Sequence, residues 1–368
     1  SSCARDGQDV ALGAESPPTG GALALVTAED HGDALLTPWS GGGSWGISVD
    51  LLTPFSLADD FGAVDAVTEV APAGSWGVDF FEYRAASSTF ASIEGVSCGH
   101  GAIVGVAAGE LHSGRPGEEL VVVTRRTIAW DVFVITTIGG GCSLGSVAAS
   151  VDTLGAAPGE ERLHRVGPAV ADFDGDGVDD VALPAVDDDG APVLVALWGD
   201  GAGAFFEETV YPLDPGCGPP GDAVALEIDG EGGGAADVVV GCTESTDLEV
   251  LLAGSGRDFD VAGSVPSGLG GTAADLLVSG SMNRDSMLDV VVAARGGRTA
   301  TVLLGTGSSP SGSSFPWVAN AEGVTTPFDI RAAAVADLDG DGFGDAILAG
   351  EAGDSGAASV AWTRSSVR

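Results

Sequence analysis

One segment of the sequence occurs twice, and it restricts what the chain can fold into. Residues 170–183 read VADFDGDGVDDVAL, and residues 335–348 read VADLDGDGFGDAIL. Each copy is a short apolar run, a loop with acids at alternate positions, and a second apolar run. The runs are rich in Val, Ala, Leu and Ile and show no helical period. Both copies therefore predict two strands joined by an acidic loop.

The same pattern of an acid followed by an apolar run recurs along the whole sequence. From Asp65 onward the steps are about 50 to 60 residues, the length of one four-stranded propeller blade. A phenylalanine after a Gly-rich turn keeps the same phase, and a further apolar run lies between acid and phenylalanine. The repeating acids are Asp33, Asp65, Glu118 or Glu119, Asp180, Asp237, Asp289 and Asp345, and the phenylalanines are Phe90, Phe205, Phe259 and Phe315.

The repeats predict an all-β fold, a single seven-bladed β-propeller over residues 1–368 with Ca²⁺-binding loops between the first and second strands of some blades. The start is irregular, since Asp33 is too close to Asp65 for a full blade. Asp9 is the competing first acid, and both phases give seven blades. Because the last repeat has three strands and an unpaired edge invites association, we expect residues 10–12 to close the last blade.

The two acidic loops have the donor spacing of a Ca²⁺ site. Carboxylates stand at loop positions 1, 3, 5 and 9, glycine stands at position 6, and position 7 supplies a backbone carbonyl in such loops. Four carboxylates in one short loop repel one another without a cation. The expected ligands are Asp172, Asp174, Asp176, Val178 and Asp180 in the first copy, and Asp337, Asp339, Asp341, Phe343 and Asp345 in the second.

Two other repeats keep part of this donor set. With fewer charges their Ca²⁺ affinity is expected to be lower, because charge count tunes affinity. These weaker candidates are Asp229, Glu231 and Asp237 in one loop, and Ser281, Asn283, Asp285 and Asp289 in the other. The turn with Asp187–Asp189 is predicted to be solvated.

Composition excludes several partners. The net charge is −40 and all 14 basic residues are arginine, so nucleic acid and anionic membrane surfaces are excluded. No apolar run is long enough for a transmembrane segment. If the chain is exported, Cys98–Cys142 and Cys217–Cys242 are the economical disulfide pairs, which leaves Cys3 as a free thiol or a lipid anchor. The expected location is extracellular, at a bacterial cell surface or periplasmic, and the expected state is a monomer.

Catalytic motifs are absent from the sequence. It has four scattered histidines and no helix-borne metalloprotease motif, G-x-S-x-G elbow or Walker loop. Glu110 and His112 could form an acid–base pair, although a degenerate Ca²⁺ loop explains them as well. These observations predict that the chain is not an enzyme.

The sequence Asp172-Phe-Asp-Gly-Asp-Gly-Val-Asp-Asp180 and its second copy resemble the DxDxDGxxD cage of FG-GAP repeats, which build the integrin α-subunit propeller and many bacterial surface proteins. The "GAP" tripeptide is mostly replaced, so this resembles a divergent bacterial member. The resemblance implies structural Ca²⁺ and a non-catalytic recognition or adhesion module that binds a protein or polysaccharide ligand at a loop face. The alternatives are a polysaccharide-active enzyme of the lyase type on a propeller scaffold, and a lectin.

Overall fold

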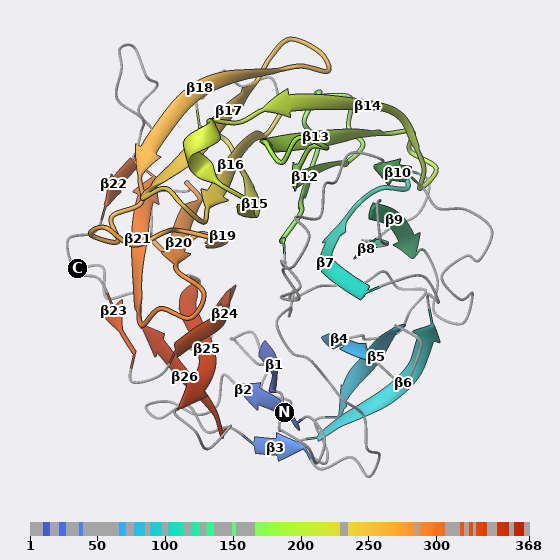
Figure 1. Cartoon of the computed structure of the whole chain (residues 1–368). Helices are drawn as coiled ribbons and strands as arrows, with labels where there is room; N and C mark the ends of the chain where they lie inside the picture. The colour runs from blue at the N-terminus through green and yellow to red at the C-terminus, as the bar shows by residue number, and fades with distance from the viewer. Residues whose placement is uncertain are drawn as a thin grey trace.

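The fold is all-β, with the sheets arranged as a propeller around a central axis (Figure 1). The structure is a computed structural model. It describes residues 10–14, 22–26, 37–39, 66–70, 77–84, 89–97, 102–113, 119–125, 130–135, 149–151, 166–228, 235–283, 287–305, 317–319, 324–326, 329–336, 344–352 and 357–363. Among these residues no helix is long and apolar enough to cross a membrane.

Four sheets are complete blades of four antiparallel strands in chain order, as the repeats predict. The first is β7 (Ala102–Gly109), β8 (Glu119–Arg125), β9 (Trp130–Ile135) and β10 (Ala149–Val151). The second is β11 (Ala169–Ala171), β12 (Asp180–Val186), β13 (Pro192–Gly199) and β14 (Phe205–Pro212). The third is β15 (Pro220–Leu226), β16 (Asp237–Cys242), β17 (Asp247–Ala253) and β18 (Phe259–Pro266). The fourth is β19 (Leu276–Gly280), β20 (Asp289–Ala293), β21 (Thr299–Gly305) and β22 (Trp317–Ala319), and β23 (Val324–Thr325) also pairs with β21.

Three further sheets have three described strands each. They are β1 (Val10–Ala14), β2 (Ala22–Val26) and β3 (Thr37–Trp39); β4 (Ala66–Val70), β5 (Gly77–Arg84) and β6 (Thr89–Ser97); and β24 (Asp329–Ala336), β25 (Asp345–Ala352) and β26 (Ala357–Thr363). Val10–Ala14 pairs over its whole length with Ala22–Val26, the next strand along the chain, which needs only a short connection. The expected closure of the last blade by residues 10–12 stays a prediction.

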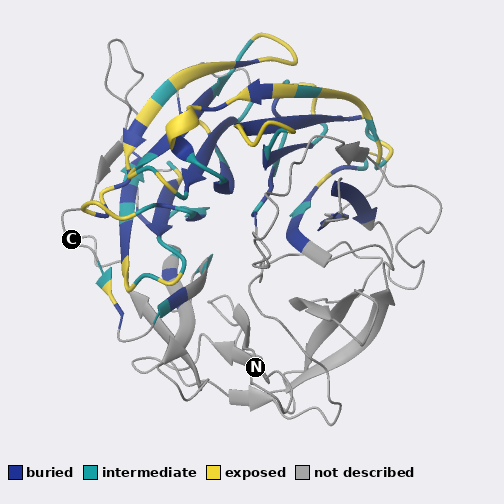
Figure 2. Cartoon of the chain, in the orientation of Figure 1, coloured by how far each residue is buried: buried dark blue, intermediate teal, exposed yellow. Residues whose placement is uncertain are grey.

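The hydrophobic core lies between neighbouring blades. One cluster joins the blade of β7–β10 to that of β11–β14, and others join each following pair of blades. The middle strand β13 is buried along its whole length, whereas the outer strands β14 and β18 are mostly exposed (Figure 2). Apolar residues on both faces of a middle strand are therefore required, which explains the continuous runs in the sequence.

The recurring phenylalanine begins the outer strand of its blade and packs between blades. Phe259, the first residue of β18, has its ring centroid 5.5 Å from Phe173, 5.9 Å from Trp198 and 5.3 Å from Tyr211. Phe173, Trp198 and Tyr211 belong to the preceding blade, so these aromatic contacts hold the two blades together. Phe205 begins β14 in the same way.

A disulfide links the short 3-10 helix η1 (Pro215–Cys217) to the end of β16. It joins Cys217 to Cys242, so this predicted pair is confirmed. Cys242 also forms an isolated bridge with Ala274, just before the next blade. The second predicted pair, Cys98–Cys142, and Cys3 lie outside the described residues.

Candidate functional site

The first acidic loop folds around the carboxylate of its first residue. Asp172 Oδ1 accepts hydrogen bonds from Gly175 N (2.7 Å) and Asp176 N (3.1 Å), and its Oδ2 accepts from Gly177 N (2.8 Å). Asp176 N also donates to Asp174 Oδ1 at 3.0 Å. Gly177 has φ of 85°, a left-handed conformation that favours glycine. The loop therefore closes tightly with its acidic side chains gathered together.

These side chains form the group of acids, among the described residues, that could hold a metal ion. One carboxylate oxygen from each of Asp172, Asp174 and Asp176 lies within 4.8 Å of the other two. All the donors are hard oxygen atoms, which suit Ca²⁺ rather than a softer metal. The donor set therefore fits the ion that the sequence predicts.

The repeating acid has a second role that sequence reasoning missed. Asp180, the first residue of β12, is 2% exposed; its Oδ2 accepts from Phe173 N (3.0 Å) and its Oδ1 from Gly199 N (2.7 Å). One carboxylate thus joins the loop after the first strand to the end of the third strand.

The same bonds recur in other blades. Asp237 accepts from Ile228 N and Ala253 N, both at 2.7 Å. Asp289 accepts from Met282 N and Gly305 N, both at 2.9 Å. Glu119, rather than Glu118, is the acid of the earlier blade. It accepts from Leu111 N and His112 N, so only the bonds to the loop after the first strand recur there among those described. This shared structural role explains why loops without the full donor set keep the acid.

Burial raises the pKa of Asp180 to about 7, against the opposing effect of the two backbone N–H groups that it accepts. Nearby Asp174 and Asp176 raise it further through charge repulsion. The ionised form of this carboxyl is therefore disfavoured when no cation is bound.

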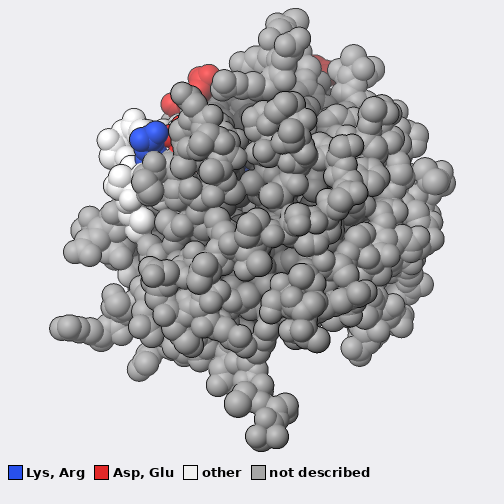
Figure 3. Space-filling view, turned by 90° about the horizontal axis from the view of Figure 1, so that it is seen from below, with Lys and Arg blue, Asp and Glu red and all other residues white. Residues whose placement is uncertain are grey.

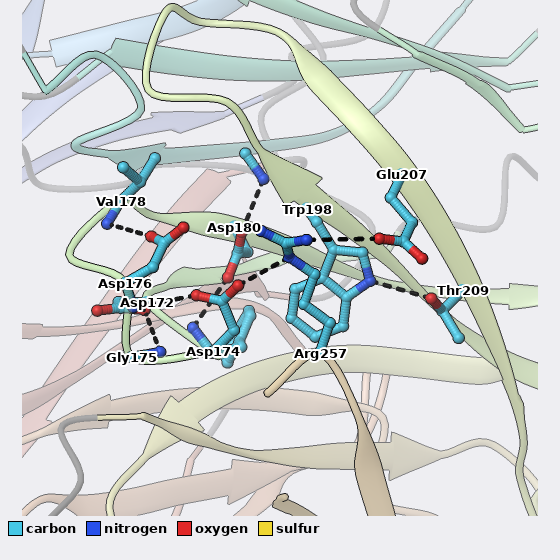
Figure 4. A network of polar contacts seen from close by, with 12 residues as sticks. Asp172, Asp174, Gly175, Asp176, Val178, Asp180, Trp198, Glu207, Thr209 and Arg257 are labelled. Carbon is cyan, nitrogen blue, oxygen red and sulfur yellow. Dashed lines mark hydrogen bonds and ion pairs between the residues drawn. The ribbon is translucent and has the colours of Figure 1, made fainter. Parts of the chain in front are cut away.

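An arginine from the next blade contacts the acidic loop (Figure 4). Arg257, in the connection between β17 and β18, donates from Nε to Asp174 Oδ2 at 2.9 Å. Its Nη1 lies 3.7 Å from Glu207 Oε2, and its guanidinium carbon lies 4.2 Å from the ring centroid of Phe206. Arg257 therefore offsets part of the loop's negative charge and ties two blades together.

The structure does not describe most of the other predicted ligands. Asp337, Asp339, Asp341, Phe343, Asp229, Glu231 and Asp285 lie outside the described residues, and Asp345 is placed only as the first residue of β25. Asn283 Nδ2 donates to Asp289 Oδ1 at 3.3 Å, and Ser281 Oγ donates to the carbonyl of Asn283 at 3.5 Å. The turn at Asp187–Asp189 is closed by hydrogen bonds to Asp187 Oδ1, and Asp188 and Asp189 are exposed as predicted.

A cavity of about 330 Å³ lies among the inner strands at the propeller axis. Most of its lining comes from β7, β11, β15, β19 and β24, the first strands of five sheets, so it belongs to the central channel. Gly167 and Pro168 precede β11, and Arg295 follows β20. Most of the lining is Val, Ala and Leu; Asp222, Ser279 and Arg295 supply polar side chains. A small-molecule site commonly has this size and this mixture of apolar walls and a few polar groups.

Asp222, which is buried, and Arg295, which is partly buried, form an ion pair at the cavity. Arg295 Nη2 lies 2.6 Å from Asp222 Oδ1 and 2.8 Å from its Oδ2. Asp222 also accepts from Gly167 N (2.6 Å) and Leu277 N (3.3 Å), which belong to the two neighbouring blades. Arg295 Nη1 donates to the carbonyl of Asp275 at 2.8 Å. Both side chains are thereby fixed by contacts across three blades, as a preorganised site requires.

The cavity's ion pair and the acidic loop lie at opposite faces of the propeller. Asp222 is near the start of β15, and Arg295 follows the end of β20, whereas the acidic loop follows the end of β11. In antiparallel blades, the start of the first strand and the end of the second meet at one face. A metal in the loop would therefore be remote from the ion pair.

No protein family and no curated protein matches this chain by sequence. Solved structures do match it over nearly its full length. A putative 6-phosphogluconolactonase from Bacteroides uniformis has a TM-score of 0.56 at 10% identity, covering 96% of this chain and 95% of the other. A periplasmic gluconolactonase from Pseudomonas aeruginosa gives 0.54 at 11%, covering 96% and 98%. A protein from Lactobacillus plantarum gives 0.53 at 15%, covering 96% and 95%. These likenesses establish the propeller fold.

The prediction that the chain is not an enzyme is corrected by this comparison. It rested on the absence of familiar catalytic motifs and on the resemblance to adhesion propellers. Two of the propellers that share this fold over nearly the whole chain are named as lactonases. The propeller fold therefore does not support a non-catalytic role.

Proposed function

We propose that this chain is an enzyme that hydrolyses a sugar-derived lactone in its central channel. The observation that carries the proposal is the cavity of about 330 Å³ with the partly buried Arg295–Asp222 pair in its wall. The lactonase names of two propellers of the same fold support the choice of reaction. The proposal also takes the propeller to have seven blades, with the three three-stranded sheets as incomplete blades.

Arg295 is the group assigned to the reacting carbonyl. In lactone hydrolysis the oxygen of water bonds to the carbonyl carbon, the ring C–O bond breaks, and the ring oxygen takes a proton. Negative charge develops on the carbonyl oxygen, and a fixed guanidinium N–H group that donates directly to that oxygen stabilises the charge. Because water is the nucleophile, the reaction needs no serine or cysteine motif.

Asp222 is assigned as a positioning residue. Both of its oxygens already accept hydrogen bonds from Arg295, and the carboxylate also accepts two backbone N–H groups. It holds the guanidinium in one orientation, which keeps the site preorganised.

The test is a titration assay of acid release from a neutral δ-lactone at constant pH, with the spontaneous rate subtracted. The proposal expects saturable hydrolysis above the spontaneous rate. A parallel assay for new unsaturated ends on polysaccharides tests the lyase reaction. Unsaturated products without lactone hydrolysis would show that the channel carries out elimination instead.

We further propose that the acidic loops bind structural Ca²⁺, on the basis of the three gathered carboxylates and their resemblance to FG-GAP cages. The ion would neutralise the repulsion within each loop, and it would be held by Asp172, Asp174 and Asp176. The disulfide and the millimolar Ca²⁺ of extracellular fluids support an exported location.

Calcium is expected to stabilise the folded protein. An ion that binds only the folded state at a hundred times its Kd adds about 2.7 kcal/mol per site, which corresponds to about 2–4 °C in Tm for a chain of this size. Thermal unfolding in EDTA and across a Ca²⁺ titration checks this, with Mg²⁺ as the control. Equal shifts with both ions, or no shift, would contradict it.

The calcium effect is expected to depend on pH. The pKa of Asp180 is about 7 in the folded chain and 3.8 ordinarily, so its contribution to metal-free stability is full below about pH 4 and is lost as pH rises through 7. Ca²⁺ favours ionised loop carboxylates. The Ca²⁺-induced rise in Tm should therefore be larger at pH 8 than at pH 5.5. An equal rise at both values would contradict this linkage.

Arg257→Gln is expected to raise the Ca²⁺ affinity of the first loop by about three- to tenfold, because it removes the cation beside Asp174. Arg298→Gln is the matched control, since it removes the same charge from an exposed pair with Asp329. Isothermal titration calorimetry measures both. Equal affinities in the two variants would show that Arg257 does not compete for the loop.

A further inference from the structure

We infer that the channel selects an uncharged, single-ring sugar lactone and rejects its phosphorylated counterpart. This inference rests on the proposed function and names the substrate class of the same site. It is drawn from the charges around Arg295, the other described arginines, and the character of the cavity wall.

The cation at the cavity is already outweighed by acids. Arg295 contacts both oxygens of Asp222, its Nη1 lies 3.9 Å from Asp275 Oδ2, and its backbone N–H donates to Asp275 Oδ1 at 2.8 Å. One guanidinium and two carboxylates leave this cluster with one net negative charge. A phosphate dianion would add like charge inside a poorly solvated wall, where repulsion is weakly screened.

The other arginines whose side chains the structure describes also form ion pairs with acidic residues. Arg257 contacts Asp174 and Glu207, and Arg298 contacts Asp329 at 2.7 Å. In the view from below, the basic group that is visible lies beside acidic ones (Figure 3). The sequence has no lysine and a net charge of −40, so the overall field also opposes anionic substrates.

The cavity wall suits a neutral ring. Ala, Val and Leu side chains offer contacts for the C–H groups of a sugar, and Ser279 brings a hydroxyl that can donate and accept. A cavity of about 330 Å³ is at the lower end of the usual range for small-molecule sites, roughly 300–1,000 Å³. This size favours one sugar ring over a polysaccharide chain.

The test compares kcat/KM for glucono-δ-lactone and for 6-phosphoglucono-δ-lactone at low ionic strength. The neutral lactone should be preferred by at least about 100-fold. Added NaCl should narrow the preference, because salt screens the repulsion from the overall net charge of −40. Asp275→Asn removes one negative charge from the cluster and should narrow the preference by at least about tenfold. Asp329→Asn, which makes the same charge change beside Arg298, should leave it unchanged.

The outcomes separate the two proposals. Equal or better turnover of the phosphorylated lactone would overturn the substrate class while leaving lactone hydrolysis in place. Hydrolysis of neither lactone would overturn the proposed function and this inference with it. The salt dependence of the unmodified protein is an independent readout if Asp275→Asn fails to fold.

Discussion

Replacing Arg295 with methionine is expected to lower kcat/KM for a neutral lactone by about 10²–10³. This is the typical cost of removing one preorganised group that stabilises a developing oxyanion. Methionine keeps much of the side chain's length and apolar stem, so the loss reports the guanidinium. The measurement is steady-state hydrolysis with the spontaneous rate subtracted.

Arg295→Met also leaves Asp222 buried without its cation, so stability must be measured beside activity. Asp222→Asn is the companion variant, because it weakens the hold on Arg295 while its amide oxygen can still accept from Gly167 N. Its Nδ2 cannot accept, so the longer bond from Leu277 N is lost. As a positioning residue, Asp222 should affect kcat more than KM. A folded Arg295→Met variant with unchanged kcat/KM would remove Arg295 from the reaction.

The second large effect is expected in stability. Asp237→Ala leaves Ile228 N and Ala253 N without the carboxylate they now share at 2.7 Å. Each buried N–H that loses its acceptor costs about 1–3 kcal/mol, so the variant should lose about 2–6 kcal/mol of unfolding free energy. Urea denaturation in EDTA measures this loss without any contribution from bound metal.

Asp188→Ala is the control for that experiment, because Asp188 is exposed in the turn between β12 and β13. Its stability should change by less than about 0.5 kcal/mol. A similarly small change for Asp237→Ala would show that the repeating acid does not hold the blade together. Metal binding alone would then have to explain why the acid recurs in each blade.

The repeat pattern was predictable from sequence because each repeat is specified locally. An acid begins the second strand of each complete blade, as at Asp180, Asp237 and Asp289, and a phenylalanine begins the outer strand at Phe205 and Phe259. These residues make the same contacts in successive blades, so the physical requirement returns at a fixed spacing. The strand order and the Cys217–Cys242 pair were also predictable, because each joins segments that are close in the sequence.

The channel site was not predictable in the same way. Gly167, Asp222, Leu277 and Arg295 come from three different blades and meet only after the ring has formed. The acids that recur at the start of the second strands lie at the other end of the first strand, so their spacing does not point to this site. A weak signal was present in Arg295, a charged residue soon after the buried run of β20 in a chain with few basic residues.

The N-terminal strand was predictable from its apolar run, and the structure places it at Val10–Ala14. Its pairing with Ala22–Val26 was not predicted, although a short connection favours neighbouring strands. The closure of the last blade by residues 10–12 stays a prediction.

Binding of the substrate in the channel at Arg295 is tested by a crystal structure with a δ-lactam analogue of the neutral sugar lactone. We expect electron density for one sugar ring in the cavity between Arg295 and Ser279, with the lactam carbonyl oxygen directed at the guanidinium. Density for the analogue at the acidic-loop face, with the channel empty, would show that the substrate does not bind at Arg295.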